Sequence, residues 1–241
     1  MPSAEVLSHR EPKYYKVKRH LLGLIETLSP GSPVPTERDL GTELATSRTT
    51  VRQALFELVA EGRLVRRQGS GTYVAEPKMI WPLQLASFTE QTNANGFTAS
   101  TQLVSAVRSH ADDSVAARLG TQTGAAAFRI ERLRLADNSP IAVEVSYLSA
   151  ARFPKLTRHL RHGASLYAVL AEHYGVAPVS AEESISTAPA TPREAALLDT
   201  DTGAPMLVLG RHSFDSTGAP IEWVTSWYRG DRVTLIASLK P

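Results

Sequence analysis

Cysteine is absent from this sequence of 241 residues. The chain therefore has no disulfide bond and no thiolate ligand for a metal, and its composition suits a reducing compartment. It also lacks any run of about 18 apolar residues, so we expect no transmembrane helix. Residues 1–18 lack the apolar core of a signal peptide. We therefore expect a cytoplasmic protein that has no membrane partner.

Net charge is also low, at +2. Residues 1–78 hold 12 Lys and Arg against 9 Asp and Glu, and the remainder holds 14 against 15. An asymmetry this small does not by itself indicate a nucleic-acid partner. The placement of the basic residues therefore matters more than their sum.

The common catalytic motifs are missing as well. The chain contains no His-Glu-x-x-His zinc motif, no Gly-x-Ser-x-Gly nucleophile elbow and no Walker-type phosphate loop. Its seven histidines are scattered. We therefore expect that the protein is not an enzyme and holds neither a metal nor a cofactor.

The first third of the chain shows three helical segments followed by a basic hairpin. Apolar residues recur at helical spacing, Thr36 is a good N-cap for the second helix, and Gly62 ends the third. The predicted helices span residues 13–28, 37–44 and 48–61, and the hairpin strands span 64–67 and 72–75.

The third helix carries two arginines, Arg48 and Arg52, which lie four residues apart and so project from one face. Arginine is the usual bidentate partner of guanine in the major groove. Thr49 and Thr50 at the helix start can donate to phosphates, and Arg38 of the second helix can reach the same groove edge. A solvated helical face is the alternative. The apolar opposite face, the capped helix before it and the glycine-tipped hairpin together favour DNA recognition.

The motifs of this region resemble those of a known family. Pro33-x-Pro35-x-Glu37-Arg38-x-Leu40, Ser47-Arg48-x-Thr50-Val51-Arg52 and Gly69-x-Gly71-Thr72-Tyr73-Val74 are similar to the winged helix-turn-helix of GntR-type bacterial regulators. The resemblance implies that Arg38, Arg48 and Arg52 read bases and that Gln68 and Gly69 are wing contacts. The predicted DNA-binding residues are Arg38, Ser47, Arg48, Thr49, Thr50, Arg52, Arg67, Gln68, Gly69 and Gly71.

The rest of the chain shows strand-like alternation mixed with short helices. Strands are expected at 102–108, 127–135, 141–148, 185–188, 206–213 and 221–228, and helices at 114–119, 165–174 and 192–198. We therefore expect an α+β protein in three parts. These are a winged helix-turn-helix domain over 1–76, a linker over 77–82, and a domain with a mostly antiparallel sheet over 83–241.

Polar residues stand out on the otherwise apolar strands of the second domain. Arg132 and Arg134 are two apart and share one face, and two neighbouring guanidiniums repel unless an anion lies between them. A solvent-facing side of the sheet would also explain the pair. Glu144 interrupts an apolar strand. Glu222 and Tyr228 share strand parity, so both can face the same pocket as Arg134.

This domain also resembles a known family. Ser87-Phe88-Thr89-Glu90, Arg132-Leu133-Arg134, Ser165-Leu166-Tyr167 and Tyr228-Arg229-Gly230-Asp231-Arg232 are similar to the UTRA domain of HutC-type regulators. That domain shares the fold of chorismate lyase and binds small effectors. The likeness is greatest to regulators of N-acetylglucosamine use, whose effector is an amino-sugar 6-phosphate. It implies a phosphate site of Phe88, Thr89, Arg132, Arg134, Ser165 and Tyr167, and a sugar site of Glu144, Glu222 and Tyr228.

Together the two domains predict a homodimeric transcription regulator, expected as a repressor, that binds palindromic double-stranded operator DNA. Two-fold symmetry of the protein demands two-fold symmetry of the DNA. The expected effector is glucosamine 6-phosphate or N-acetylglucosamine 6-phosphate, and another anionic metabolite is the alternative. Two other classes of function remain as alternatives, an enzyme of lyase-like fold and an architectural DNA binder.

Overall fold

The computed structural model describes residues 12–67, 70–75, 77–160 and 163–238. The chain divides between Lys78 and Met79 into two compact units. Each unit has a hydrophobic core of its own. Within the described ranges, every helix is too short or too polar to cross a membrane.

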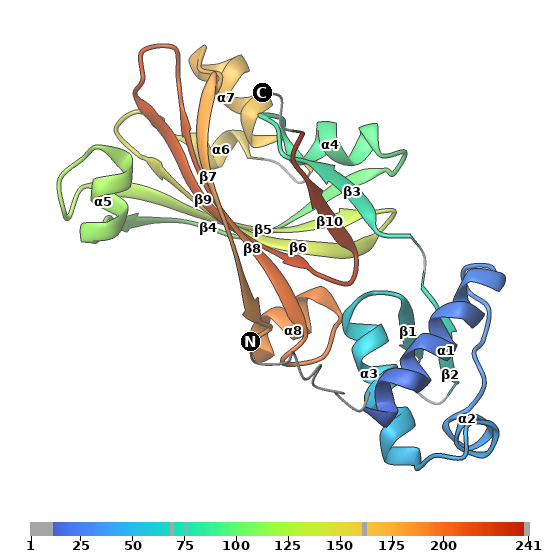
Figure 1. The fold of residues 1–241 in the computed structure, drawn as a ribbon. Coiled ribbons are helices and arrows are strands. Elements are labelled where there is room, and N and C mark those ends of the chain that lie inside the picture. Colours follow the sequence, from blue (N-terminus) through green and yellow to red (C-terminus); the bar gives the residue numbers. More distant parts are fainter. Residues whose placement is uncertain (1–11, 68–69, 76, 161–162, 239–241) are drawn as a thin grey trace, which may run out of the picture. The chain divides into compact units, whose positions relative to one another are not determined.

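Three helices and a two-stranded hairpin form the first unit (Figure 1): α1 (Lys13–Thr27), α2 (Glu37–Glu43), α3 (Arg48–Ala60), β1 (Leu64–Arg67) and β2 (Gly71–Val74). Helix α1 packs against α3. The core between the helices is formed by buried side chains that include Leu21, Leu40, Val51, Leu55 and Leu58. The predicted winged helix-turn-helix is confirmed.

Side-chain caps mark the starts of helices α2 and α3. Thr36 Oγ1 accepts a hydrogen bond from the backbone N of Asp39 at 3.3 Å, and Ser47 Oγ accepts one from Thr50 N at 3.2 Å. Gly62 follows α3 with a φ of 67°, a conformation that favours glycine. These local signals explain why the helix boundaries could be predicted closely.

The second unit is built on a six-stranded antiparallel sheet with the strand order β4-β5-β6-β9-β8-β7 (Figure 1). Its strands are β4 (Ala99–His110), β5 (Ala126–Ala136), β6 (Ser139–Ser149), β7 (Ser180–Pro189), β8 (Pro205–Phe214) and β9 (Pro220–Arg229). The predicted α+β class is confirmed. Strand β7 is longer than the predicted 185–188, because its mostly exposed residues give no apolar alternation.

The described residues of this unit also form five helices: α4 (Phe88–Ala94), α5 (Asp113–Leu119), α6 (Leu156–His159), α7 (Leu166–Tyr174) and α8 (Pro192–Leu198). Strand β5 shows which helices share a face. Ile130 packs in one core with residues of α6 and α7, and Leu133 packs in another with residues of α8. Because side chains alternate along a strand, Arg132 and Arg134 lie on the face of α6 and α7.

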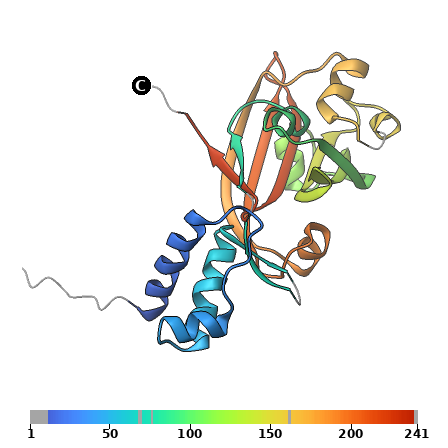
Figure 2. The same cartoon turned by 90° about the vertical axis from the view of Figure 1, so that its right-hand side faces the viewer.

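Most of the segment that was predicted to be a linker, 77–82, belongs to a strand. Met79–Pro82 forms strand β3, which pairs in parallel with β10 (Val233–Ile236), as Figures 1 and 2 show. Trp81 is buried, with its ring centroid 5.5 Å from that of Phe88 and 5.4 Å from that of Tyr228. A four-residue strand that pairs with the far end of the chain leaves no local pattern that a sequence reading could detect.

Candidate functional site

Helix α3 presents a polar face to solvent and buries an apolar one. Arg48, Thr49 and Arg52 are exposed, whereas Val51 and Leu55 are buried. Two arginines on the open side of a short helix have the placement that major-groove readout requires. At the start of the helix, the hydroxyls of Ser47 and Thr50 lie 2.8 Å apart, so both take part in the cap.

A carboxylate lies among the predicted DNA-binding arginines. Glu37, the first residue of α2, accepts hydrogen bonds from Arg52 Nη2 at 2.8 Å and from Arg66 Nη2 at 3.3 Å. The hydrogen bond from Arg52 lowers the pKa of Glu37, so this carboxylate is ionised at neutral pH. Arg38 extends into solvent, with its side chain 76% exposed and its Nε 3.6 Å from Asp39.

The wing is described in part. Arg67 ends β1, and Gly71 begins β2 with a φ of 122°, in the region that favours glycine. Gln68 and Gly69, both predicted to contact DNA, lie outside the described residues. Near the tip, Tyr73 Oη donates to the carbonyl oxygen of Ser70 at 3.0 Å.

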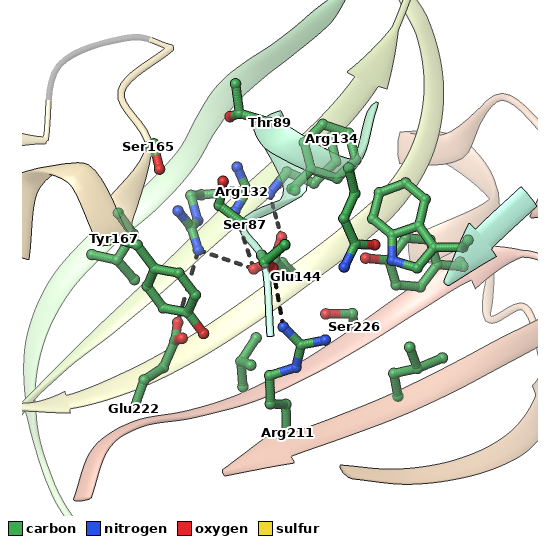
Figure 3. Close-up of a pocket in the computed structure, with 18 of the residues that line it drawn as sticks. Ser87, Thr89, Arg132, Arg134, Glu144, Ser165, Tyr167, Arg211, Glu222 and Ser226 are labelled. Atoms are coloured by element: carbon green, nitrogen blue, oxygen red, sulfur yellow. Dashed lines mark hydrogen bonds and ion pairs between the residues drawn. The ribbon is translucent and has the colours of Figure 1, made fainter. Parts of the chain in front are cut away.

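A pocket in the second unit brings all nine predicted effector residues together (Figure 3). It contains about 580 Å³ of atom-free space, part of which is open solvent. Its walls come from β3, from α4 and the residues just before it, from β5, β6, β7, β8 and β9, and from the start of α7. The nine residues are Phe88, Thr89, Arg132, Arg134, Glu144, Ser165, Tyr167, Glu222 and Tyr228.

Strand register explains why the charged residues meet. Arg132 of β5 lies opposite Glu144 of β6. Two residues along the same face, Arg134 and Tyr228 are both paired with Ala142. The alternative of a solvent-facing sheet side is wrong, because Arg132 and Arg134 are only 3% and 4% exposed.

Glu144 lies between the two arginines and accepts hydrogen bonds from both (Figure 3). Arg132 Nη2 is 2.9 Å and Arg134 Nη2 is 3.1 Å from Glu144 Oε1, and Arg134 Nε contacts Oε2. Burial alone would raise the pKa of Glu144, but Arg134 and Arg132 together lower it to about 2. The pocket therefore holds an ionised carboxylate at neutral pH.

Two buried charged groups in the pocket have unmet hydrogen bonds. Within the described residues, Arg132 Nε and Nη1 have no hydrogen-bond partner, and neither has Glu222 Oε1. Glu222 Oε1 is 3.9 Å from Arg132 Nη2, which is too far for a hydrogen bond. Burial raises the pKa of Glu222. Buried polar groups normally have partners, so the pocket suits a ligand that offers acceptors to Arg132 and a donor to Glu222.

The two helices that begin beside the pocket, α4 and α7, each have a backbone N–H capped by the serine that precedes the helix. Ser87 Oγ accepts from the backbone N of Glu90 at 3.2 Å, and Ser165 Oγ accepts from Ala168 N at 3.4 Å. Tyr167 Oη lies 3.1 Å from the hydroxyl of Ser213. Burial raises the pKa of the Tyr167 phenol, which therefore stays protonated and can donate.

Sequence reasoning missed one cation of this pocket, Arg211 of β8. Its Nη1 donates to the carbonyl oxygen of Ala86 at 3.2 Å and its Nη2 to that of Gln84 at 3.3 Å. Its Nε donates to Glu183 Oε1 at 3.2 Å. Arg211 thus joins the sheet to the segment before α4. The parity argument used for Arg134 would have found it, because Arg211 is two residues after Leu209 on an apolar strand and therefore shares its face.

Comparison with known proteins gives two family matches. Residues 13–74 match the bacterial regulatory proteins of the gntR family, and residues 94–234 match the UTRA domain. The chain is 39% identical to the HTH-type transcriptional repressor PhnF of Mycolicibacterium smegmatis, over 93% of this chain and 91% of PhnF. The crystal structure of PhnF superposes with a TM-score of 0.67 at 38% identity, covering 93% of this chain and 99% of that chain.

Two further relatives extend the comparison. The chain is 36% identical to the repressor NagR of Bacillus subtilis, over 93% of each protein. It is 32% identical to the histidine utilization repressor of Pseudomonas putida, over 84% of this chain and 82% of that protein. These relatives are repressors, so the enzyme alternative is wrong. The chain belongs to the gntR family of bacterial regulatory proteins and is a HutC-type transcriptional repressor with a UTRA domain.

Proposed function

We propose that this repressor senses a phosphorylated amino sugar, glucosamine 6-phosphate or N-acetylglucosamine 6-phosphate. The observation that carries the proposal is that two groups of opposite charge in the pocket lack hydrogen-bond partners. Among the described residues, Arg132 has two guanidinium nitrogens and Glu222 has one oxygen without a hydrogen-bond partner. A buried unsatisfied group costs about 1–3 kcal/mol. A ligand with an anion at one end and hydroxyl or amino donors at the other would meet both needs.

In this proposal the phosphate binds at Arg132 and Arg134, beside the starts of α4 and α7, with contributions from Phe88, Thr89, Ser165 and Tyr167. The sugar extends toward Glu222 and Tyr228. The resemblance implies that Glu144 contacts the sugar, but we assign it a different role. Because it accepts hydrogen bonds from both arginines, we assign it to holding them in the phosphate site.

Another anionic metabolite is the second candidate for the effector. PhnF and the histidine utilization repressor match this chain at 39% and 32% identity, and NagR, an N-acetylglucosamine regulator, at 36%. Similarity alone therefore does not select the effector. The amino-sugar phosphate is preferred because it combines an anion with neutral or basic donors.

We propose further that the repressor acts as a homodimer on a palindromic operator. Helix α3 of each protomer would enter the major groove, with the wing beside it. Binding of the effector would shift the population between arrangements in which the two DNA-binding units can or cannot reach both half-sites.

Operator binding followed by fluorescence anisotropy tests the effector. A palindromic probe is titrated at one fixed salt concentration with glucosamine 6-phosphate, N-acetylglucosamine 6-phosphate, the two unphosphorylated sugars and inorganic phosphate. We expect a change of operator affinity with one of the sugar phosphates and none with the unphosphorylated sugars. A response to inorganic phosphate alone, or to none of the five, would reject the amino-sugar effector.

A further inference from the structure

Glu37 is an unexpected residue on a surface that binds DNA. The dense negative charge of DNA repels a carboxylate and attracts lysine and arginine. Glu37 nevertheless lies beside Arg52 and Arg66, and its side chain is 26% exposed. Its charge weakens nonspecific attraction to every DNA sequence. A carboxylate in this position therefore needs a compensating advantage.

The geometry of the Glu37–Arg52 pair indicates what that advantage is. Arg52 Nε lies 3.2 Å from both carboxylate oxygens of Glu37, and Arg52 Nη2 lies 2.8 Å from Oε2. These contacts use one edge of the planar guanidinium. The remaining edge, which includes Nη1, is the one that can donate to O6 and N7 of guanine. Arg52 stays 63% exposed, so this edge is accessible.

The same carboxylate connects three elements. Glu37 begins α2, Arg52 lies on α3, and Arg66 lies on β1 of the wing. Arg66 Nη2 donates to Glu37 Oε1 at 3.3 Å. One side chain of α2 therefore sets the positions of a cation on the recognition helix and of a cation on the wing strand.

We propose that Glu37 is a positioning residue for operator recognition, which holds the guanidinium of Arg52 in the orientation that reads a base and links it to the wing through Arg66. A long, exposed arginine loses rotamer freedom when it binds. Glu37 restricts Arg52 before DNA arrives, so less freedom is lost on binding. The advantage applies only where Arg52 meets its correct base. Glu37 therefore lowers affinity for DNA in general and increases discrimination between operator and other sequences.

The test compares Glu37→Gln with Arg52→Ala and with a matched control, Glu43→Gln. Glu43 lies on the same helix and pairs with His20 at 3.2 Å instead of with a predicted DNA-binding arginine. Affinities are measured for the operator, for its single-base variants and for an unrelated duplex, over a series of salt concentrations. Thermal unfolding of each variant checks the fold.

For Glu37→Gln we expect tighter binding to the unrelated duplex and a salt dependence steeper by up to about one charge. Discrimination should fall by about threefold to tenfold, at the same base pair that Arg52→Ala relaxes. Glu43→Gln should keep full discrimination. In the Arg52→Ala background, Glu37→Gln should cause no further loss of discrimination.

Two results would overturn the proposal. If Glu37→Gln discriminates like the unchanged protein, Glu37 acts through its charge alone. If it weakens binding to all sequences equally and lowers the melting temperature, its role is structural. Should Glu37→Gln fail to fold, Glu37→Asp serves instead, because it keeps the charge but shortens the reach. That variant should lose discrimination without any gain in general affinity.

Discussion

At the scale of single residues, the effector pocket depends on charges that are paired inside the protein. Glu144 is ionised because Arg132 and Arg134 more than offset the effect of burial on its pKa. Glu222, on the same face of the sheet, has its pKa raised by burial. The two carboxylates should therefore affect the free energy of unfolding with opposite sign.

Glu144→Ala should lower the free energy of unfolding at pH 7 by about 3–5 kcal/mol, because it leaves two buried guanidiniums without their carboxylate. The pKa of Glu144 is lowered from 4.5 to about 2. Its stabilisation is therefore complete above about pH 4.5 and is lost as the pH falls toward 2. Urea unfolding at pH 7 and pH 3 should show the deficit of the variant shrinking at the lower pH. A deficit that is equal at both pH values would contradict this assignment.

Glu222→Gln is the counterpart of that variant. A raised folded-state pKa means that the charge of Glu222 opposes folding at pH values above it. The variant should therefore be more stable than the unchanged protein at pH 7, and the difference should disappear as the pH falls below 4.5. Urea unfolding measures both. A loss of stability at pH 7 would mean that Glu222 is a stabilising ion-pair partner of Arg132.

Arg134→Ala should remove the response to the effector while operator binding without effector persists. Arg134 lies in the second unit and uses Nε and Nη2 on Glu144 and Nη1 on Thr101 at 2.8 Å. Its loss removes one of the two arginines of the proposed phosphate site. Anisotropy titrations of the operator with and without the sugar phosphates measure both properties. A normal response would exclude Arg134 from the phosphate site.

At the scale of elements, local sequence patterns predicted the helices and strands whose bounds depend on nearby residues. The Thr36 cap placed α2 close to its observed start. The strand-like patterns of β5, β6, β8 and β9 placed those strands close to their observed bounds. Strands β3 and β10 were missed because they are four residues long and stabilise each other only through pairing between distant parts of the chain. The nine effector residues were predicted from parity and resemblance together, but the adjacency of Arg132 and Glu144 required the strand register.

Arg211 links strand β8 to the segment before α4, two parts of the chain that lie far apart in the sequence. Replacing it with Ala removes the hydrogen bonds to the carbonyl oxygens of Gln84 and Ala86. Amide hydrogens of residues 83–88 should then exchange about tenfold faster, because this segment loses its anchor to β8. Arg152→Ala is the matched control, since Arg152 also donates to a backbone carbonyl, that of Pro220, and it should leave residues 83–88 unchanged. Equal exchange in both variants would show that Arg211 does not hold the segment.

At the scale of the whole molecule, one DNA-binding unit and one effector unit share a chain, and β3 begins only five residues after β2 ends. A single recognition helix reads few base pairs, so specificity in a genome requires a second copy. The proposed homodimer would supply that copy through a two-fold axis, and it would restrict the operator to half-sites whose spacing the axis sets.

The spacing of the half-sites therefore tests the dimer directly. In a palindrome with half-sites about one helical turn apart, 10–10.5 base pairs, both α3 helices can reach the same side of the DNA. Inserting five base pairs rotates one half-site by about half a turn, so affinity should fall to that of a single half-site. Inserting ten base pairs should restore part of the affinity, because the two half-sites face the same side of the DNA again although the distance between them is larger. Sedimentation of the free protein should give twice the mass of the chain, 26.1 kDa. A monomer that binds the single half-site as tightly as the palindrome would exclude the homodimer, because such a protein gains nothing from symmetry.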